Sequence, residues 1–398
     1  MHKHGGTILY LDTGPWLGGA QRSMLTLINA LDWQTWNPMV VAADDSEFGV
    51  LYECEFHRIS CEHVRFRHWL RRPSGALAFL WDGLRLRRAF RHLRRDRRID
   101  LVHANTARAG LLACMGVPQT IPMVVHDRDV SMPGVARRIL ARRAARVIAL
   151  SETVAKTWAR TPNARVEIVP NGFDIESLRE VSPAPRLAAL GGRFAVVQVA
   201  DMVRWKRHDL FIDAMADVCS QDAEARAAIV GRALPPDGEV YLRELQNRVA
   251  GLGLHDRIEF VTDCENAVPW IAAADLLVST ADDEPFGRVV VESLAVGTPV
   301  VVTEGGGPEE IARQANGAAT MVPATPARLA DAILARRCPV GRLAVYNDAV
   351  RCAQAYDISR VVPRIEAVYR QILDEYSSRP ANSEAVAADV ASKQEAQK

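Results

Sequence analysis

The sequence has little of what marks a membrane-spanning, disulfide-bonded or zinc-binding protein. Its 398 residues contain no stretch of about 20 apolar residues free of charge and proline, so we predict no transmembrane helix. The seven cysteines are scattered and none lies in a C-x-x-C pair, which predicts reduced thiols in a cytoplasmic protein. The ten histidines form no H-x-x-x-H pair, which argues against a zinc site.

What the sequence does have is the composition of an ordinary globular protein, with 48% hydrophobic and 24% charged residues. Its length is too great for one core, so we expect two domains. Short apolar runs alternate with helical patterns, which predicts an α/β architecture with parallel sheets. The predicted strands are 8–12, 39–43, 101–103, 123–125 and 147–150, and then 195–199, 227–230, 258–261, 276–279 and 300–302.

A segment with two prolines and a Gly-Gly pair, 181–192, separates these two series of strands and reads as a linker. We therefore predict a first domain over 1–180 and a second over 181–357. A last helical pattern covers 358–376, and the polar tail 377–398 is expected to be disordered.

The net charge is only +1, but basic residues concentrate in the first half of the chain. Arg85 to Arg98 contains eight arginines, and Leu84, Leu86, Phe90 and Leu93 form a thin apolar stripe at near-helical spacing. Three interpretations stay open: a basic amphipathic helix on an anionic membrane, a nucleic-acid contact, or a solvated helix face.

The segment 282–293, D-D-E-P-F-G-R-V-V-V-E-S, holds two glutamates, Glu284 and Glu292, on either side of Gly287. It lies between a predicted strand and a helix predicted at about 286–296, whose first backbone N–H groups lack intrahelical partners. Such a helix end binds anions, and a glycine lets a ligand approach closely. Two carboxylates around a phosphate site fit a nucleotide-sugar, which carries a diol on each side of its diphosphate. Alternatively, Glu292 is a solvated helix residue and Glu284 caps the helix.

Two glycine-rich turns follow other predicted strands. Gly18 and Gly19 lie in P-W-L-G-G-A-Q-R and would let a ligand reach the backbone, although such a turn alone has low specificity. The segment 303–311, T-E-G-G-G-P-E-E-I, places three glycines before Pro308, a residue suited to the first helical position.

Basic residues follow the first strand of the second predicted domain. Arg204, Lys206 and Arg207 lie in A-D-M-V-R-W-K-R-H, just beyond the carboxyl end of that strand. There the cations could neutralise a diphosphate. The alternative is the basic start of a surface helix.

In this order and spacing, the motifs resemble those of retaining glycosyltransferases of family four, which have the GT-B fold. The resemblance runs from Gly18 to about Tyr376. It implies two Rossmann-like doubly wound domains that face a cleft, the first on the acceptor side and the second holding the nucleotide-sugar, with the final helix crossing back to the first domain. The matching motifs are G-G-A-Q-R at 18–22, V-V-H-D at 124–127, V-P-N-G-F-D at 169–174, W-K-R-H at 205–208, E-P-F-G-R-V-V-V-E-S at 284–293 and G-T-P-V-V at 297–301.

The resemblance implies roles for individual residues. Glu292 is expected to hold the ribose hydroxyls, Glu284 to contact hydroxyls of the donor sugar, and Lys206 to bind the diphosphate. His126 is expected beside the transferring sugar. The expected catalytic residues are His126, Glu284 and Lys206, and the expected donor-binding residues are Gly18, Gly19, Arg22, Arg204, Lys206, Glu284, Pro285, Phe286, Gly287, Arg288 and Glu292.

One position departs from the family pattern. Asp201 stands where the family usually has an arginine that joins the lysine on the diphosphate. An aspartate there would repel a diphosphate unless it turns away, so we expect Arg204 to supply the missing positive charge.

The resemblance also implies a mechanism in which the departing phosphate accepts the proton of the acceptor hydroxyl during front-face attack. Glu284 and Glu292 are therefore not expected to be the acid and base of a hydrolase. His126 could transfer a proton, but we expect it to position the sugar. Asp127 and Asp129 form a D-x-D pair of the kind that holds a metal in another transferase fold, yet the family needs neither metal nor cofactor and we expect none.

Two rival functions remain: a nucleotide-sugar 2-epimerase, which needs no acceptor, and a non-catalytic sugar-nucleotide-binding protein. The expected partners are a UDP- or GDP-sugar and a glycan, lipid-linked or small-molecule acceptor, with no nucleic acid. We expect a cytoplasmic protein that can contact the inner face of an anionic membrane through Arg85 to Arg98.

Overall fold

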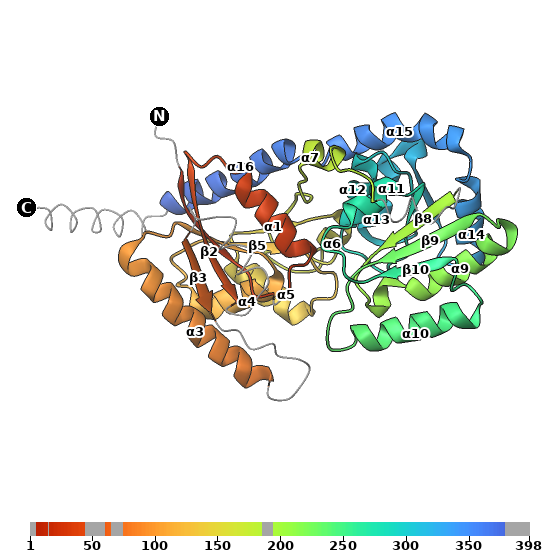
Figure 1. Ribbon diagram of the computed structural model, residues 1–398. Helices are drawn as coiled ribbons and strands as arrows, with labels where there is room; N and C mark the ends of the chain where they lie inside the picture. The colour runs from red at the N-terminus through yellow and green to blue at the C-terminus, as the bar shows by residue number, and fades with distance from the viewer. Residues whose placement is uncertain (1–4, 15, 44–59, 65–74, 185–193, 379–398) are drawn as a thin grey trace, which may run out of the picture. The chain divides into compact units, whose positions relative to one another are not determined.

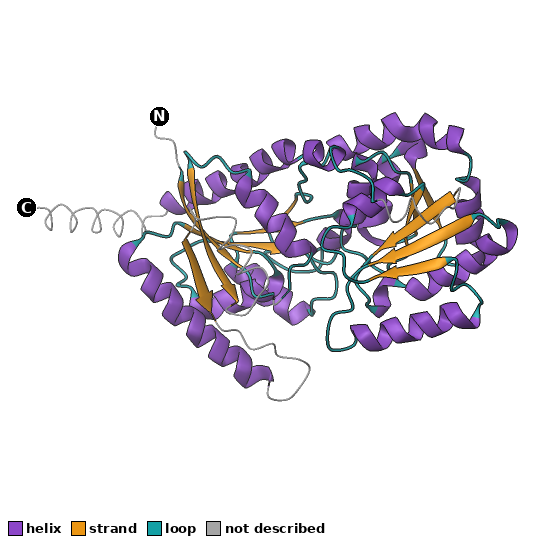
Figure 2. Ribbon diagram, viewed as in Figure 1, coloured by secondary structure: helices purple, strands orange, loops and turns teal. Residues whose placement is uncertain are grey.

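The computed structural model describes residues 5–14, 16–43, 60–64, 75–184 and 194–378 (Figure 1). Most of the predicted linker and nearly all of the predicted tail lie outside these residues. The chain forms two compact units, which we call unit 1 (Met1–Gly172 with Ile358–Lys398) and unit 2 (Phe173–Asp357). Each unit has a sheet with helices packed against it (Figure 2).

Unit 1 contains a seven-stranded sheet in the order β3-β2-β1-β4-β5-β6-β7, and every neighbouring pair is parallel. The strands are β1 (Gly6–Leu11), β2 (Trp36–Ala43), β3 (Ser60–Val64), β4 (Leu101–Ala104), β5 (Met123–Asp127), β6 (Arg146–Ala149) and β7 (Val166–Ile168). The helices are α1 (Gly19–Asn29), α3 (Gly75–Asp96), α4 (Ala107–Gly116), α5 (Gly134–Arg143), α6 (Glu152–Lys156) and α16 (Ile358–Ser377).

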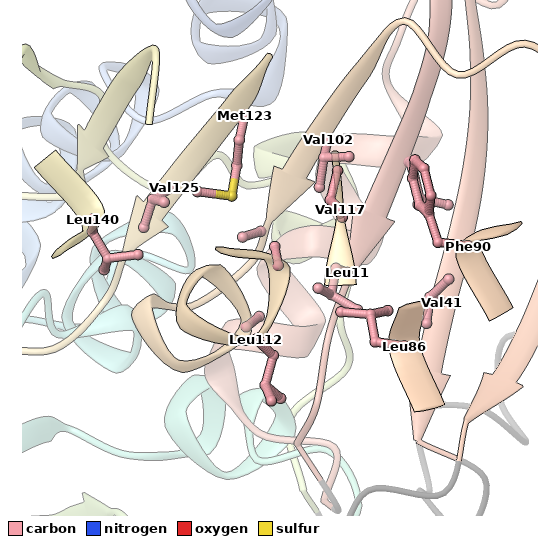
Figure 3. Close-up of a cluster of buried hydrophobic side chains, with 14 of the residues drawn as sticks. Leu11, Val41, Leu86, Phe90, Val102, Leu112, Val117, Met123, Val125 and Leu140 are labelled. Atoms are coloured by element: carbon pink, nitrogen blue, oxygen red, sulfur yellow. The ribbon is translucent and has the colours of Figure 1, made fainter. Parts of the chain in front are cut away.

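The strands of unit 1 are apolar on both faces because helices cover both faces of the sheet. In β1, Leu9 and Leu11 belong to one buried cluster while Ile8 and Tyr10 belong to another, as the alternation of side chains along a strand requires. Figure 3 shows the first cluster, to which α3, α4 and α5 contribute side chains.

The last helix, α16, packs on the second face of the same sheet. Its buried residues Val361, Ile365 and Tyr369 lie in one cluster with Tyr10 and Trp36. The expectation that the final helix returns to the first domain is therefore confirmed.

Unit 2 contains a six-stranded parallel sheet in the order β10-β9-β8-β11-β12-β13. The strands are β8 (Phe194–Val199), β9 (Ala225–Val230), β10 (Ile258–Val261), β11 (Leu276–Ser279), β12 (Val300–Thr303) and β13 (Ala319–Val322). The helices are α7 (Ile175–Arg179), α9 (His208–Gln221), α10 (Gly238–Gly251), α11 (Val268–Ala273), α12 (Arg288–Ala295), α13 (Gly306–Gln314), α14 (Pro326–Ala335) and α15 (Pro339–Gln354), with 3-10 turns η1 (Arg204–Lys206) and η2 (Asn316–Ala318).

In both sheets the chain order reverses beside the first strand of the unit. Unit 1 reverses between β1 and β4, and unit 2 reverses between β8 and β11. In open parallel sheets, ligands bind beyond the carboxyl ends of the strands at such a switch point. The predicted fold, two Rossmann-like doubly wound domains, is confirmed, and each topology marks where a ligand would bind.

Most of the apolar stripe noted on the arginine-rich helix faces inward, so Leu86, Phe90 and Leu93 do not form an exposed apolar face. Leu86, Phe90 and Leu93 belong to the buried cluster that Figure 3 draws in part, because they share the face of α3 that packs against the sheet of unit 1. Leu84 lies on the other side of the helix and is 50% exposed.

Candidate active site

The segment that carries Glu284 lies at the switch point of unit 2. β11 ends at Ser279, and the loop that follows it leads to Glu284 and then to α12. The neighbouring strand β8 leads into the loop with Lys206. Two adjacent strands therefore deliver a carboxylate and an ammonium group to the same edge of the sheet.

Lys206 Nζ forms an ion pair with Glu284 Oε2, and the two side chains are 20% and 16% exposed. The ammonium also lies 4.0 Å from the ring centroid of Trp205. Thr280 Oγ1 donates to the backbone oxygen of Lys206 at 2.9 Å, which ties the two loops together. Partial burial strengthens the field of these charges relative to bulk water.

The glycine-rich segment 303–311 packs against the Glu284 turn. Gly307 N–H donates to the backbone oxygen of Glu284 at 2.7 Å. A Cβ on Gly306 would lie 2.4 Å from that same oxygen, and Gly306 has a φ of +73°. Glycine is therefore required for this close approach. We predicted Pro308 at the first position of this helix, but α13 begins at Gly306 and Pro308 is its third residue. Proline is tolerated at either position, because the backbone N–H groups of the first helical turn have no intrahelical acceptor.

Gly287 is the N-cap of α12, which begins at Arg288 and not at Phe286 as predicted. The backbone of Gly287 is left-handed, with a φ of +90°, and this conformation ends the turn before the helix starts. The first N–H groups of α12 are accordingly presented after Gly287, with no side-chain cap on them.

Glu292 lies one turn into α12 and is mostly buried. Its Oε1 is 3.1 Å from Arg288 Nη2, and the two side chains are 14% and 19% exposed. The Arg288 guanidinium also lies 4.5 Å from the ring centroid of Phe173. Phe286 stacks on Phe173 with a centroid distance of 6.1 Å and meets Tyr356 edge-on at 5.8 Å. These aromatic contacts fix the turn that carries Glu284, Pro285 and Gly287.

The structure does not bring Arg204 to the ammonium of Lys206. Arg204 Nη2 pairs with Glu244 Oε1 at 2.7 Å, and its guanidinium lies over the ring of Tyr241. Its proposed role as a substitute phosphate ligand stays a prediction. Asp201 is held by Arg232, whose backbone N–H donates to Asp201 Oδ1 at 3.1 Å and whose Nε lies 3.5 Å from the same atom.

The Gly18–Gly19 turn of unit 1 is held by a buried aspartate. Asp12 Oδ1 accepts from Gln21 Nε2 at 3.0 Å, and Gln21 Oε1 accepts from Gly18 N–H at 3.2 Å. Asp12 Oδ2 accepts from Asn105 Nδ2 at 2.6 Å, which joins the ends of β1 and β4 at the switch point of unit 1. Gly19 is the first residue of α1.

Arg22 and His126, the other predicted residues of unit 1, differ in exposure. Arg22 is exposed on the first turn of α1. His126 lies in β5 and is only 2% exposed. Burial, together with the positive charge of Arg128, lowers the pKa of His126 well below its usual value, so the imidazole is neutral at pH 7.

Asp127 of the D-x-D pair is held by hydrogen bonds within unit 1. Asp127 Oδ2 accepts from Trp158 Nε1 at 2.7 Å, and Asp127 Oδ1 accepts from the Asp129 N–H at 3.3 Å. Burial raises the pKa of Asp127 to about 6. Among the residues whose placement is described, no group of three or more His, Cys, Asp or Glu side chains could hold a metal ion.

Sequence reasoning missed several residues that shape these loops. Asp12 and Asn105 directly follow the neighbouring strands β1 and β4, so their position after a strand was a usable signal. Arg232, which pairs with Asp201, lies two residues after the end of β9. Phe173 and Tyr356 lie far from Phe286 in the sequence, and no local pattern marks their packing.

Two family models match most of the chain. The model described as Glycosyltransferase Family 4 matches residues 17–177, and the model described as Glycosyl transferases group 1 matches residues 185–335. A D-inositol 3-phosphate glycosyltransferase of Catenulispora acidiphila is 28% identical over 71% of this chain and 74% of its own length. A mannosylfructose-phosphate synthase of Agrobacterium fabrum is 34% identical, but the match covers 36% of this chain and 33% of that protein.

Solved structures extend the similarity to almost the full length. The Anabaena protein HepE in complex with UDP and glucose superposes with a TM-score of 0.78 and 25% identity, covering 92% of this chain and 99% of HepE. Its complex with UDP-glucose gives a TM-score of 0.76 and 26% identity. The chain belongs to glycosyltransferase family 4 and is a retaining glycosyltransferase that uses a nucleotide-sugar donor.

Proposed function

We propose that the chain transfers a hexose from a UDP-sugar to a hydroxyl group of a lipid-linked or other glycan acceptor. The observation that carries this proposal is the arrangement at the switch point of unit 2. There two neighbouring loops bring together the Lys206–Glu284 ion pair, and the second loop leads directly into α12, which carries Glu292. UDP is proposed over GDP because HepE, similar over nearly the whole chain, is solved with UDP-glucose.

In this proposal each group acts on a different part of the donor. Glu292 accepts hydrogen bonds from the ribose hydroxyls, and Glu284 accepts them from hydroxyls of the sugar. The N–H groups around Gly287 and the ammonium of Lys206 meet the diphosphate, which becomes more negative as it leaves. Fixed positive potential at that point lowers the barrier to bond breaking. We further propose 1–180 as the acceptor domain and 181–357 as the donor domain, with 358–376 returning to the first.

A product assay tests the reaction. The protein is incubated with UDP-glucose, UDP-galactose, UDP-N-acetylglucosamine and GDP-mannose, with and without a bacterial lipid extract, and the sugars are followed by proton NMR. We expect one UDP-sugar to be consumed only with acceptor, giving a product with the anomeric configuration of the donor. A new epimer of the nucleotide-sugar without acceptor identifies the 2-epimerase, and binding without turnover identifies the non-catalytic alternative.

We also propose that α3 contacts an anionic membrane surface, where a lipid-linked acceptor would be found. None of the helices in the described part of the chain is long and apolar enough to span a bilayer. The exposed side of α3 carries Leu77, Leu80, Trp81 and Leu84, which are 64%, 49%, 56% and 50% exposed. Their spacing places all four on one face of the helix.

The same exposed side of α3 becomes basic toward its C-terminal end. Exposed arginines follow the apolar residues at the spacing of the same face: Arg87, Arg88, Arg91, Arg94 and Arg95. On such a helix surface, leucine and tryptophan side chains can insert among lipid tails while the neighbouring arginines contact anionic headgroups. This contact supports the peripheral location that we propose, and the cytoplasmic location remains a proposal from the scattered cysteines.

Vesicle cosedimentation tests the membrane proposal. Wild-type protein is expected to pellet with vesicles of phosphatidylglycerol and phosphatidylethanolamine, less so at high salt, and not with phosphatidylcholine alone. Leu80→Ser should weaken binding, because it removes a leucine that is 49% exposed on this face. Leu252→Ser, at a leucine that is 46% exposed beside α10, is the matched control. Equal binding to neutral vesicles, no binding, or dimerisation through this face contradicts the proposal.

A further inference from the structure

Four aromatic rings form a buried hydrogen-bonded row that crosses the sheet of unit 1. Tyr10 lies on β1, His103 on β4, His126 on β5, and Tyr369 on α16 at the far end of the sequence. All four are at most 2% exposed. The distances are 3.1 Å from Tyr10 OH to Tyr369 OH, 2.6 Å from Tyr369 OH to His103 Nδ1, and 3.3 Å from His103 Nε2 to His126 Nδ1.

The row ends at Arg128, whose guanidinium can only donate hydrogen bonds. Arg128 Nη2 lies 3.2 Å from His126 Nδ1. The guanidinium is held in place because its Nε donates to Asn105 and its Nη1 donates to Asn171 Oδ1 at 2.5 Å. His126 Nδ1 must therefore accept, and it carries no proton.

The fixed donor Arg128 determines which atom donates and which accepts in each hydrogen bond of the row. Because His126 Nδ1 is an acceptor, His103 Nε2 must donate to it. Burial lowers the pKa of His103 to about 3, so that ring is neutral and its Nδ1 must accept from the Tyr369 hydroxyl. Tyr10 then donates to Tyr369, and burial raises the pKa of both phenols, which keeps them protonated. The row thus has one direction, from Tyr10 to His126.

The remaining nitrogen of His126 carries the proton of the neutral ring. His126 Nε2 is buried and has no hydrogen-bond partner among the residues that the structure describes. Leaving a buried N–H without an acceptor costs about 1–3 kcal/mol. An orphaned donor at the carboxyl edge of a central strand, where ligands bind in such sheets, points to an acceptor supplied by a ligand.

We propose that Arg128 and the row from Tyr10 to Tyr369 hold His126 as a hydrogen-bond donor at Nε2, directed to an oxygen of a bound ligand. Arg128 and Tyr369 are thus positioning residues, and His126 is a donor and not the base that deprotonates the acceptor. A base would need a bare Nε2, and the proton would then face the guanidinium of Arg128. The identity of the ligand rests on the proposed function, whereas the tautomer does not.

Long-range proton–nitrogen NMR of the full chain with nitrogen-15-labelled histidine reads the tautomer without any substrate. The signal of His126 is assigned by its loss in His126→Asn. We expect a bare Nδ1 and a protonated Nε2 from pH 6 to pH 8. A proton on Nδ1, or a charged ring in this range, would overturn the proposal.

Variants of Arg128 test whether this residue sets the tautomer of His126. Arg128→Met removes the obligate donor, and we expect His126 to become a mixture of tautomers. Arg128→Lys keeps a donor and should keep the Nε2–H form. Arg143→Met removes another half-buried arginine of unit 1, which donates to backbone oxygens of Pro118 and Ile121, and should leave the tautomer unchanged. If His126 keeps its wild-type tautomer in Arg128→Met, Arg128 does not set that tautomer and the proposal is wrong.

Turnover gives a second readout. Glutamine can place an amide N–H near the position of Nε2, whereas asparagine can reach only the position of Nδ1. We therefore expect His126→Gln to keep more activity than His126→Asn, by about 10-fold to 100-fold in kcat/KM, as the loss of one buried hydrogen bond implies. Equal loss in both variants contradicts a donor role. If the wild type transfers no sugar at all, the proposed function fails while the NMR result stands.

Discussion

Replacing Gly287 by alanine tests whether the turn between Glu284 and α12 requires a glycine. Gly287 has a φ of +90° and a ψ of +57°, a left-handed conformation that residues with a Cβ avoid. A Cβ at this position would also lie 2.8 Å from Cγ of Pro308. The Cβ that alanine adds therefore destabilises the folded state in two ways, through an unfavourable backbone conformation and through a steric clash with Pro308.

The two costs can be put into numbers. A left-handed backbone costs about 1–2 kcal/mol for a residue with a Cβ. Forcing an extra methyl group into a packed contact costs about 1–3 kcal/mol. Together they predict a loss of about 2–5 kcal/mol, which is a large share of the roughly 5–15 kcal/mol that stabilises a folded domain.

Other glycines of unit 2 separate the two costs. Gly305 has a φ of +110° and open space around it, so alanine there meets only the conformational cost. Gly307 has no positive φ, but its Cβ would lie 2.4 Å from Cα of Phe286, so alanine there meets only the steric cost. Gly251, the last residue of α10, has neither problem, and Gly251→Ala should stay within about 0.5 kcal/mol of wild type.

Urea unfolding followed by tryptophan fluorescence measures these differences as shifts of the midpoint. We expect Gly251→Ala near wild type, Gly305→Ala lower, and Gly287→Ala lower still, with weaker donor binding by Gly287→Ala. A midpoint for Gly287→Ala equal to that of Gly251→Ala would refute the reasoning about this turn.

Three further outcomes follow from buried groups. Leu86→Ala should lower the free energy of unfolding by about 2–5 kcal/mol because Leu86 is fully buried, whereas Leu84→Ala should lower it by less than about 0.5 kcal/mol. Equal losses for the two variants, measured by chemical denaturation, would contradict the assigned faces of α3. Burial raises the pKa of Asp127 to about 6, so the wild type loses stability as Asp127 gives up its proton with rising pH. Asp127→Asn has no such proton to lose, so it should become more stable relative to wild type as the pH rises. The expected gain between pH 5 and 7.5 is about 1–2 kcal/mol, and a gain on acidification instead would show the wrong sign. Lys206→Met should weaken donor binding about 10-fold to 100-fold by loss of a charge-assisted hydrogen bond, and unchanged calorimetric affinity would exclude Lys206 from the diphosphate.

The sequence predicts the strands and turns best where local chemistry alone decides them. Predicted strands 258–261 and 276–279 agree with β10 and β11 as observed, because both are short, mostly apolar segments with aspartates close by on either side. The glycines of 305–307 lie where a strand meets a helix, and Gly305 and Gly306 adopt positive φ. The strand β7 was missed because it has only three residues and they are half-buried or exposed.

The faces of α3 show what periodicity cannot decide. Leu86 and Phe90 share one face, and Leu80 and Leu84 share another, so both faces carry apolar residues at helical spacing. Only the position of the sheet determines that Leu86 and Phe90 are buried. The sequence therefore predicts the helix correctly but does not decide which of its two apolar faces lies against the sheet.

The environment of His126 lies beyond local sequence patterns altogether. The motif V-V-H-D identifies the histidine, but its tautomer depends on Arg128, which is nearby, and on Tyr369, which is 266 positions away from His103. Contacts at that separation come from the packing of α16 on the sheet, and no spacing rule anticipates them. The side chain that matters can be predicted, whereas its protonation state needs the fold.

The most direct test of the central claim is calorimetric titration of wild type and Glu292→Gln with UDP-glucose and GDP-mannose, without added metal. Glu239→Gln, at a side chain 72% exposed on α10, is the matched control. We predict that the wild type and the control bind UDP-glucose equally, that GDP-mannose binds more weakly, and that Glu292→Gln loses about 10-fold or more in affinity. Equal affinity in Glu292→Gln, or no binding of either donor to the wild type, would contradict the assignment of the donor site to this turn.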